Sequence, residues 1–341
     1  MRALALAILA FGFALPATAQ PLRPSRPTGA PPIPDDPSEP LPSALRRIAE
    51  DVPNEGTPMP DEHYPVSNEH RHDLWFPHIR DLGGAFVGVG TDQCYTLAAV
   101  QNARIVWIVD YDPLVPLVHR MYGALLPVSD DAAALVARFS DEQREVTEAL
   151  LGERLADDPE RDAIVRLYRR NRERMHAYLR RAQRNAGATW LADPALYARV
   201  RALHAGGRII ARNGDVTANG ALRSVGRAAS RIGLPIRVVY FSNAEQFFRY
   251  GEGFRANLDA LFGDERTVVL RTFREPGAPY PRGDRWHYMV QPLSDMRARI
   301  AENGYRASRQ FVMDLVGHRS RLGESGVSVL DASVPRRFEA R

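Results

Sequence analysis

The sequence contains no lysine: all 45 basic residues are arginines, set against 41 acidic residues. Because arginine does not deprotonate, this bias raises the isoelectric point by itself, so the small positive net charge does not indicate an anionic partner. Only one cysteine, Cys94, is present, which excludes an intramolecular disulfide. After the first twenty residues, no stretch approaches the roughly 18 apolar residues that a membrane-spanning helix needs.

The first residues have the pattern of a secretory signal peptide. Arg2 precedes an apolar run from Ala3 to Leu15, and the small residues Ala17 and Ala19 form a cleavage site. We expect cleavage after Ala19, which would place the mature protein in the periplasm or outside the cell. An uncleaved membrane anchor is the less favoured alternative, because the apolar run is short for a bilayer core of roughly 30 Å.

The next segment, residues 20–65, holds 13 of the 26 prolines. Its composition predicts a disordered, proline-rich tether, interrupted by one short helix at Ser43–Glu50. We expect a single α/β domain over residues 66–320 and a C-terminal tail over 321–341. The hydrophobic content of 45% is sufficient for one large core in a chain of this length.

Short apolar runs that alternate with helical segments predict a doubly wound, mostly parallel sheet. The predicted strands are Ala85–Val89, Ile105–Val109, Arg208–Ala211, Ile236–Phe241 and Thr267–Thr272, with Trp286–Gln291 as an edge strand. The predicted helices are 67–82, Thr91–Gln101, Ala218–Ile232, Gly253–Phe262 and Ser294–Asn303. About 95 residues of helical pattern separate the second strand from the third, so we expect a helical insertion at about 114–205.

Polar residues follow four of the predicted strands, at the sheet edge where open parallel sheets bind ligands. Gly88 and Gly90 form a glycine turn after the first strand, and the helix that follows would present free backbone N–H groups. Asp110 lies about 20 residues further on, the spacing of a carboxylate that binds ribose hydroxyls. The other candidates for this crevice are Asp92, Gln93, Asp112, Asn213, Asp215, Asn243 and Glu245, of which Asn243 and Glu245 are also candidate catalytic residues. The alternative role of the Asn and Asp residues is helix capping, and the alternative for Gly88 and Gly90 is a tight turn that needs glycine for steric reasons only.

Four motifs carry a resemblance to a known family. They are GVGTDQ–Y at Gly88–Tyr95, IVDYD at Ile108–Asp112, NGD at Asn213–Asp215 and VYFSNAEQF at Val239–Phe247. Over about residues 66–274, the chain resembles a widespread bacterial family of uncharacterised function whose core is similar to class I S-adenosylmethionine-dependent methyltransferases.

The resemblance implies a Rossmann-like sheet and a methyltransferase-like binding site for S-adenosylmethionine or a related nucleoside. The glycine turn would contact the methionine part, Asp110 or Asp112 the ribose, and Asp215 the edge of the adenine. Asn243 would face the substrate. Because S-adenosylmethionine is made in the cytoplasm and its fixed charges prevent passive passage through a bilayer, an exported protein would bind another molecule or would bind without catalysis. The sequence leaves open whether the protein is an enzyme.

Four histidines, at positions 63, 70, 72 and 78, lie close together in the sequence. Residues i and i+2 of a helix point apart, so His70 and His72 could not both bind one metal ion from a helix. We therefore expect no metal site.

The segment Arg161–Arg184 carries nine arginines but only two carboxylates. A solvated helix face is the expected role, and nucleic acid is a disfavoured partner because no aromatic residues alternate there to stack on bases. Contact with an anionic membrane surface remains an alternative. The competing hypothesis is therefore a non-catalytic envelope binding or interaction protein that uses this Arg-rich surface.

Overall fold

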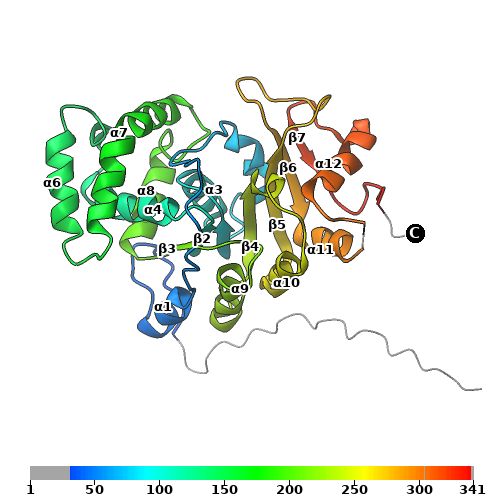
Figure 1. Cartoon of the computed structure of the whole chain (residues 1–341), viewed down its shortest axis with the longest axis horizontal. Helices are drawn as coiled ribbons and strands as arrows, with labels where there is room; N and C mark the ends of the chain where they lie inside the picture. The colour runs from blue at the N-terminus through cyan, green and yellow to red at the C-terminus, as the bar shows by residue number, and fades with distance from the viewer. Residues whose placement is uncertain (1–30, 303, 339–341) are drawn as a thin grey trace, which may run out of the picture.

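The computed structural model describes residues 31–302 and 304–338, so the predicted signal peptide lies outside the described residues. Within them, a seven-stranded, mostly parallel sheet is covered by helices on both faces, which confirms the predicted α/β class (Figure 1). The strand order is β3-β2-β1-β4-β5-β6-β7. Strands β1 to β5 are parallel, β6 is antiparallel to β5, and β7 is parallel to β6. The strands are β1 (Ala85–Gly88), β2 (Ile105–Asp110), β3 (Ile209–Asn213), β4 (Ile236–Ser242), β5 (Gly263–Phe273), β6 (His287–Pro292) and β7 (Val327–Val329).

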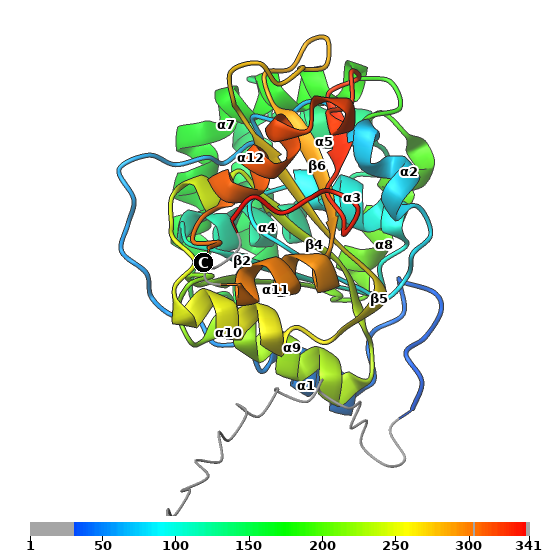
Figure 2. The same cartoon turned by 90° about the vertical axis from the view of Figure 1, so that its right-hand side faces the viewer.

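Each face of the sheet has its own hydrophobic cluster, because side chains alternate along a strand. In β2, Val106 and Ile108 belong to one cluster, whereas Ile105 and Trp107 belong to the other. The first face is covered by α2 (Phe76–Ile79), α3 (Gln93–Gln101), α4 (Leu114–Leu125), α5 (Ala132–Ala137), α6 (Arg144–Arg154), α7 (Arg161–Arg184) and α8 (Pro194–Ala205). The second is covered by α1 (Ser43–Glu50), α9 (Ala221–Ile232), α10 (Glu252–Ala260), α11 (Leu293–Ala301) and α12 (Ser308–Gly317), of which α9 to α11 are seen below the sheet in Figure 2.

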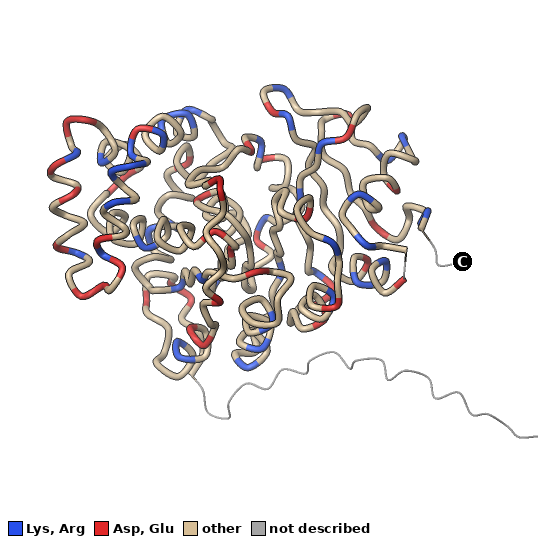
Figure 3. The backbone as a smooth tube through the Cα atoms, in the orientation of Figure 1, with Lys and Arg blue, Asp and Glu red and all other residues tan. Residues whose placement is uncertain are grey.

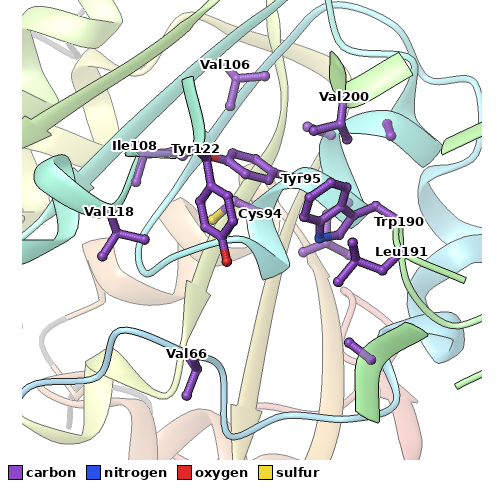
Figure 4. Packing of buried hydrophobic residues seen from close by; sticks show 14 of the residues in the cluster. Val66, Cys94, Tyr95, Val106, Ile108, Val118, Tyr122, Trp190, Leu191 and Val200 are labelled. Carbon is purple, nitrogen blue, oxygen red and sulfur yellow. The ribbon is translucent and has the colours of Figure 1, made fainter. Parts of the chain in front are cut away.

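Helices α4 to α8 form the insertion between β2 and β3, and they share a core with α3. Tyr95 of α3 makes edge-on contacts with Tyr122 of α4 and with Trp190, which precedes α8, at centroid distances of 5.8 and 5.5 Å (Figure 4). All three side chains are buried. The insertion therefore packs on the sheet as part of one domain. Over residues 31–302 and 304–338, no helix has both the length and the apolar character needed to cross a membrane.

The proline-rich segment, expected as a tether, packs on the domain from residue 31 onward. Leu41, Leu45 and Ile48 are buried against the face that α9 covers. Trp107 Nε1 donates a hydrogen bond to the Ala49 carbonyl at 2.9 Å. The tether prediction overlooked that these apolar residues recur at helical spacing and give α1 a buried stripe despite the flanking prolines. Residues 20–30 lie outside the described part.

Two other expectations are corrected at the ends of the domain. Instead of a helix over 67–82, the chain forms a short 3-10 turn at His72–Trp75 and the four-residue α2, which begins one residue before Pro77. Proline lacks a backbone N–H and is tolerated in the first helical turn but not in a helix interior, which explains the late start. In the expected tail, Val327–Val329 forms β7 beside β6, so the strand predicted at the sheet edge is an inner strand.

Candidate functional site

A pocket of about 570 Å³ opens at the carboxyl ends of β1 to β4. Strands β1 and β4 are neighbours in the sheet, although β2 and β3 come between them in the sequence. The order in which the strands are added to the sheet therefore reverses at this point. This is the switch point at which open α/β sheets bind their ligands. The volume lies within the range of small-molecule sites, roughly 300–1,000 Å³. Pro60, Glu62 and Tyr64, which precede β1, form part of the wall.

Asp110, at the end of β2, holds the glycine turn in place. Its Oδ2 accepts a hydrogen bond from the Gly90 N–H at 2.7 Å, and its Oδ1 accepts one from the Asp112 N–H at 2.8 Å. Gly90 has a φ of +87°, and a Cβ there would lie 2.2 Å from the side-chain nitrogen of Gln93. Burial raises the pKa of Asp110 to about 6. Because each carboxylate oxygen can accept a second hydrogen bond, Asp110 can still receive hydroxyl groups of a ligand.

The backbone N–H groups of the glycine turn already have partners inside the protein. Besides the bond from Gly90 to Asp110, the Thr91 N–H donates to Gln93 Oε1 at 3.0 Å. The expectation of free N–H groups at the start of the helix is therefore wrong for Thr91. The N–H groups of Gly90 and Thr91 are both engaged within the protein and do not point to a phosphate ligand.

Three further predicted residues line the pocket with Gly90, Gln93 and Asp110: Asp112, Asp215 and Asn243. Asp112 also caps α4, accepting from the Leu114 N–H at 2.9 Å, and its Oδ2 lies 2.8 Å from His63 Nδ1. Asp215 accepts hydrogen bonds from the backbone and the hydroxyl of Thr217, both at 2.7 Å. Asp112 and Asp215 therefore combine local hydrogen bonds with a place at the crevice.

Asp92 and Asn213 do not line the pocket; both hold neighbouring segments together. The buried carboxylate of Asp92 accepts hydrogen bonds from Trp190 Nε1 at 3.1 Å and from the Tyr178 hydroxyl at 3.3 Å, which join α3 to the insertion. Asn213 Oδ1 accepts from the Thr57 N–H at 2.9 Å. These two predicted ligand contacts are thus structural contacts.

Glu245 and Gly88 are also placed outside the pocket lining. The buried Glu245 accepts a hydrogen bond from the Tyr250 hydroxyl at 2.6 Å and lies 3.1 Å from Arg271 Nε of β5. A Cβ at Gly88 would lie 3.1 Å from Cys94 Sγ, so this glycine permits close packing of β1 on α3. Glu245 thus pairs with a core arginine and lines a separate cavity rather than this pocket.

Sequence reasoning missed a buried carboxylate beside the pocket. Ser242 lines the pocket with a φ of +52°, and its hydroxyl donates to Glu69 at 2.6 Å. Glu69 also accepts from Tyr240 at 2.6 Å and from Thr272 at 2.7 Å. Burial alone would raise the pKa of Glu69, but the neighbouring His72 and hydrogen bonds from the hydroxyl groups of Ser242 and Tyr240 outweigh it and hold the pKa below its ordinary value. Nothing in the local sequence around Glu69 marks it as buried.

The lining of the pocket is acidic and aromatic. Its described residues include no lysine, arginine or histidine, although the chain is rich in arginine. Phe247 is 82% exposed, and Tyr64 and Tyr111 are exposed as well. Exposed aromatic rings around a concavity are typical of a binding site, because a ligand can cover them. The acidic residues are Glu62, Asp110, Asp112 and Asp215, and the aromatic residues are Tyr64, Tyr111, Phe247 and Phe248.

The histidines do not assemble into a metal centre. Throughout the described ranges, no three His, Cys, Asp or Glu side chains gather as metal ligands. His63 faces Asp112 at the main pocket, whereas His70 and His72 line a second cavity.

The fold and the pocket together define an α/β protein with a small-molecule-sized crevice at the switch point of its sheet. The chain belongs to the family described as "Domain of unknown function (DUF7790)", which matches residues 64–331. The match includes all seven strands but begins after Pro60 and Glu62 of the pocket wall. No curated protein matches the chain.

Proposed function

We propose that the protein binds a small, positively charged, nucleoside-type molecule in the pocket between β1 and β4, on a Rossmann-like and methyltransferase-like scaffold. The observation that carries this proposal is the lining, which has four carboxylates, four aromatic rings and no basic side chain. In a protein site with an effective dielectric constant of about 20, one carboxylate at 4 Å attracts a unit positive charge by about 4 kcal/mol. Aromatic faces add roughly 0.5–2 kcal/mol to the binding of a cation.

The strand order supports the scaffold assignment. The order β3-β2-β1-β4-β5 is that of Rossmann-type sheets, in which a carboxylate after the second strand binds the ribose. Asp110 occupies that position and lines the pocket. The antiparallel β6 departs from the fully parallel Rossmann order, but it lies two strands away from the crevice.

The acidic and aromatic side chains of the lining suit S-adenosylmethionine better than a phosphorylated nucleotide. Its sulfonium and ammonium groups are positive, Asp110 and Asp112 would hold its ribose, and the aromatic rings would stack on its adenine. When bound, it would supply a methyl group for transfer. In an exported protein, another cation of this type would take its place, because S-adenosylmethionine stays in the cytoplasm.

The competing hypothesis, an interaction protein that uses the Arg-rich α7, is less well supported. Arg169 pairs with Glu148 at 2.6 Å and Arg172 pairs with Asp141 at 2.5 Å, both within the insertion. Figure 3 shows acidic and basic segments interleaved over α6 and α7. The charge of the exposed Arg169 is therefore neutralised, and the buried Arg172 adds none to the surface of the helix.

The test compares three ligands that share adenosine but differ in charge: S-adenosylmethionine, adenosine and adenosine monophosphate. Calorimetric titration of the full-length protein is expected to give the tightest binding for the cation and the weakest for the phosphorylated compound. Equal or tighter binding of adenosine monophosphate would contradict the proposal. Mass spectrometry of small molecules retained by gently purified protein would identify a natural ligand of the same charge.

Two variants assign the binding to the pocket. Asp215→Asn keeps the acceptor for Thr217 and removes one charge from the lining, so we expect about tenfold weaker binding of the cation with an unchanged melting temperature. Asp110→Ala is expected to abolish binding, although it also releases the Gly90 N–H. Asp157→Asn, at an exposed position of the insertion, is the control. Equal affinities for all these proteins would place the ligand elsewhere.

A further inference from the structure

A second cavity, of about 340 Å³, lies where three distant segments meet: the turn ahead of α2, the end of α7 and the β5–β6 loop. The four arginines in its lining come from all three segments: Arg71, Arg181, Arg184 and Arg282. In Figure 3, basic segments occur at the end of α7 and in the β5–β6 loop, both on the upper side of the molecule. The charge of this cavity is thus opposite to that of the main pocket.

Most of this positive charge is not neutralised within the protein. In the described part of the chain, no carboxylate lies within ion-pair distance of Arg181, Arg184 or Arg282, whereas Arg71 pairs with Asp73 at 2.7 Å. The only carboxylate in the lining belongs to Glu69, which is occupied by the hydroxyl groups of β4 and β5. Three guanidinium groups of the lining therefore have no carboxylate partner, and that of Arg181 lies over the Tyr178 ring, 5.7 Å from its centroid.

The cavity also contains a buried side chain without a complete set of partners. His72 is only 2% exposed and stacks on Trp75. Its Nε2 lies 3.5 Å from Glu69, and neither of its ring nitrogens has a hydrogen-bond partner. Buried polar atoms in native proteins are normally hydrogen-bonded, and a bound ion or water is one way to satisfy such an atom.

The walls of the cavity are fixed by hydrogen bonds between the segments. The backbone N–H of His70 donates to Asp284 at 2.7 Å, and Asn185 at the end of α7 donates to the His70 carbonyl at 2.8 Å. These bonds hold the arginine-bearing segments together before any ligand arrives. Such preorganisation reduces the entropy cost of binding.

We propose that this cavity binds a phosphate group. Guanidinium groups donate paired hydrogen bonds that match the oxygens of a phosphate, and several of them around one concavity favour a multiply charged anion over a single carboxylate. The phosphate can belong to a soluble compound or to a lipid headgroup. The inference is independent of the cationic ligand proposed for the main pocket, because the two sites differ in position and in charge.

The test uses two phosphate probes on the full-length protein: pyrophosphate in calorimetry at constant ionic strength, and vesicles containing phosphatidic acid in co-sedimentation. The variant Arg181→Ala/Arg184→Ala removes two arginines of the cavity. The matched control Arg166→Ala/Arg170→Ala removes two exposed arginines of the same helix and the same net charge.

We expect the cavity variant to weaken binding by about tenfold or more and the control to change it by less than about twofold. Pyrophosphate binding with this pattern supports a soluble ligand, and vesicle binding alone with this pattern supports a lipid headgroup. If neither probe binds, or if both double variants lose the same affinity, the proposal is overturned. Unchanged melting temperatures of both variants would show that the losses are not due to unfolding.

Discussion

Replacing Asp92 by asparagine is expected to stabilise the protein at neutral pH. The Asp92 carboxylate is buried, one of its oxygens accepts hydrogen bonds from Trp190 and Tyr178, and the other oxygen has no partner. Burial raises its pKa from the ordinary 3.8 to about 6. Asparagine has the same shape, can accept the same two hydrogen bonds and carries no charge that must be removed from water.

The direction of the effect follows from proton binding. Because the folded protein holds the Asp92 proton more tightly than the unfolded chain does, the contribution to stability is fully present below about pH 3.8 and is lost as the pH rises through about 6. A rise in pKa from 3.8 to about 6 corresponds to a total loss of about 3 kcal/mol, of which about 2 kcal/mol falls between about pH 4.5 and pH 8. The Asp92→Asn variant has no carboxyl group at this position, so its free energy of unfolding should not show this decrease.

Urea unfolding of wild type and Asp92→Asn at about pH 4.5 and at pH 8 measures the difference directly. The quantity to compare is the free energy of unfolding of the variant minus that of wild type. This difference should be about 2 kcal/mol larger at pH 8 than at pH 4.5. The exposed Asp157→Asn is the control and should show no such dependence on pH. If the difference between Asp92→Asn and wild type were the same at both pH values, burial would not be what perturbs Asp92.

Two further outcomes test the N-terminal part of the chain. Leu45→Ala should lower the free energy of unfolding by about 2–5 kcal/mol, because Leu45 of α1 is fully buried in the hydrophobic cluster that α1 shares with α9; an unchanged urea midpoint would mean that this segment does not pack on the domain. N-terminal sequencing of protein recovered from the envelope or culture medium should begin at Gln20, and a chain that still starts at Met1 would refute export with cleavage.

The first five strands could be predicted because each contains a short apolar run and helices separate it from the next of the five. The helix α1 was predicted at its observed bounds, but not its packing: the prolines around it suggested disorder, and only the partner surface on α9 gives its apolar stripe a place to be buried. The strand β7 has three residues, too few for a reliable pattern.

The candidate site was predicted as a region but not side chain by side chain. Parallel strands bring their carboxyl ends together whatever the details, so Asp110, Asp215 and Asn243 meet at one pocket. The side chains of Asp92 and Glu245 point towards partners that are distant in the sequence, Trp190 and Arg271. No local sequence pattern identifies these partners. The burial of Glu69 could not be predicted for the same reason, because its partners on β4 and β5 are distant in the sequence.

The stretch before residue 64 forms part of the crevice although it lies outside the family match. Pro60 and Glu62 contribute to the pocket wall, yet they lie ahead of the region that the family match covers. Substitutions in the segment ahead of residue 64 would therefore change one part of the crevice wall and leave the sheet and its glycine turn unaltered.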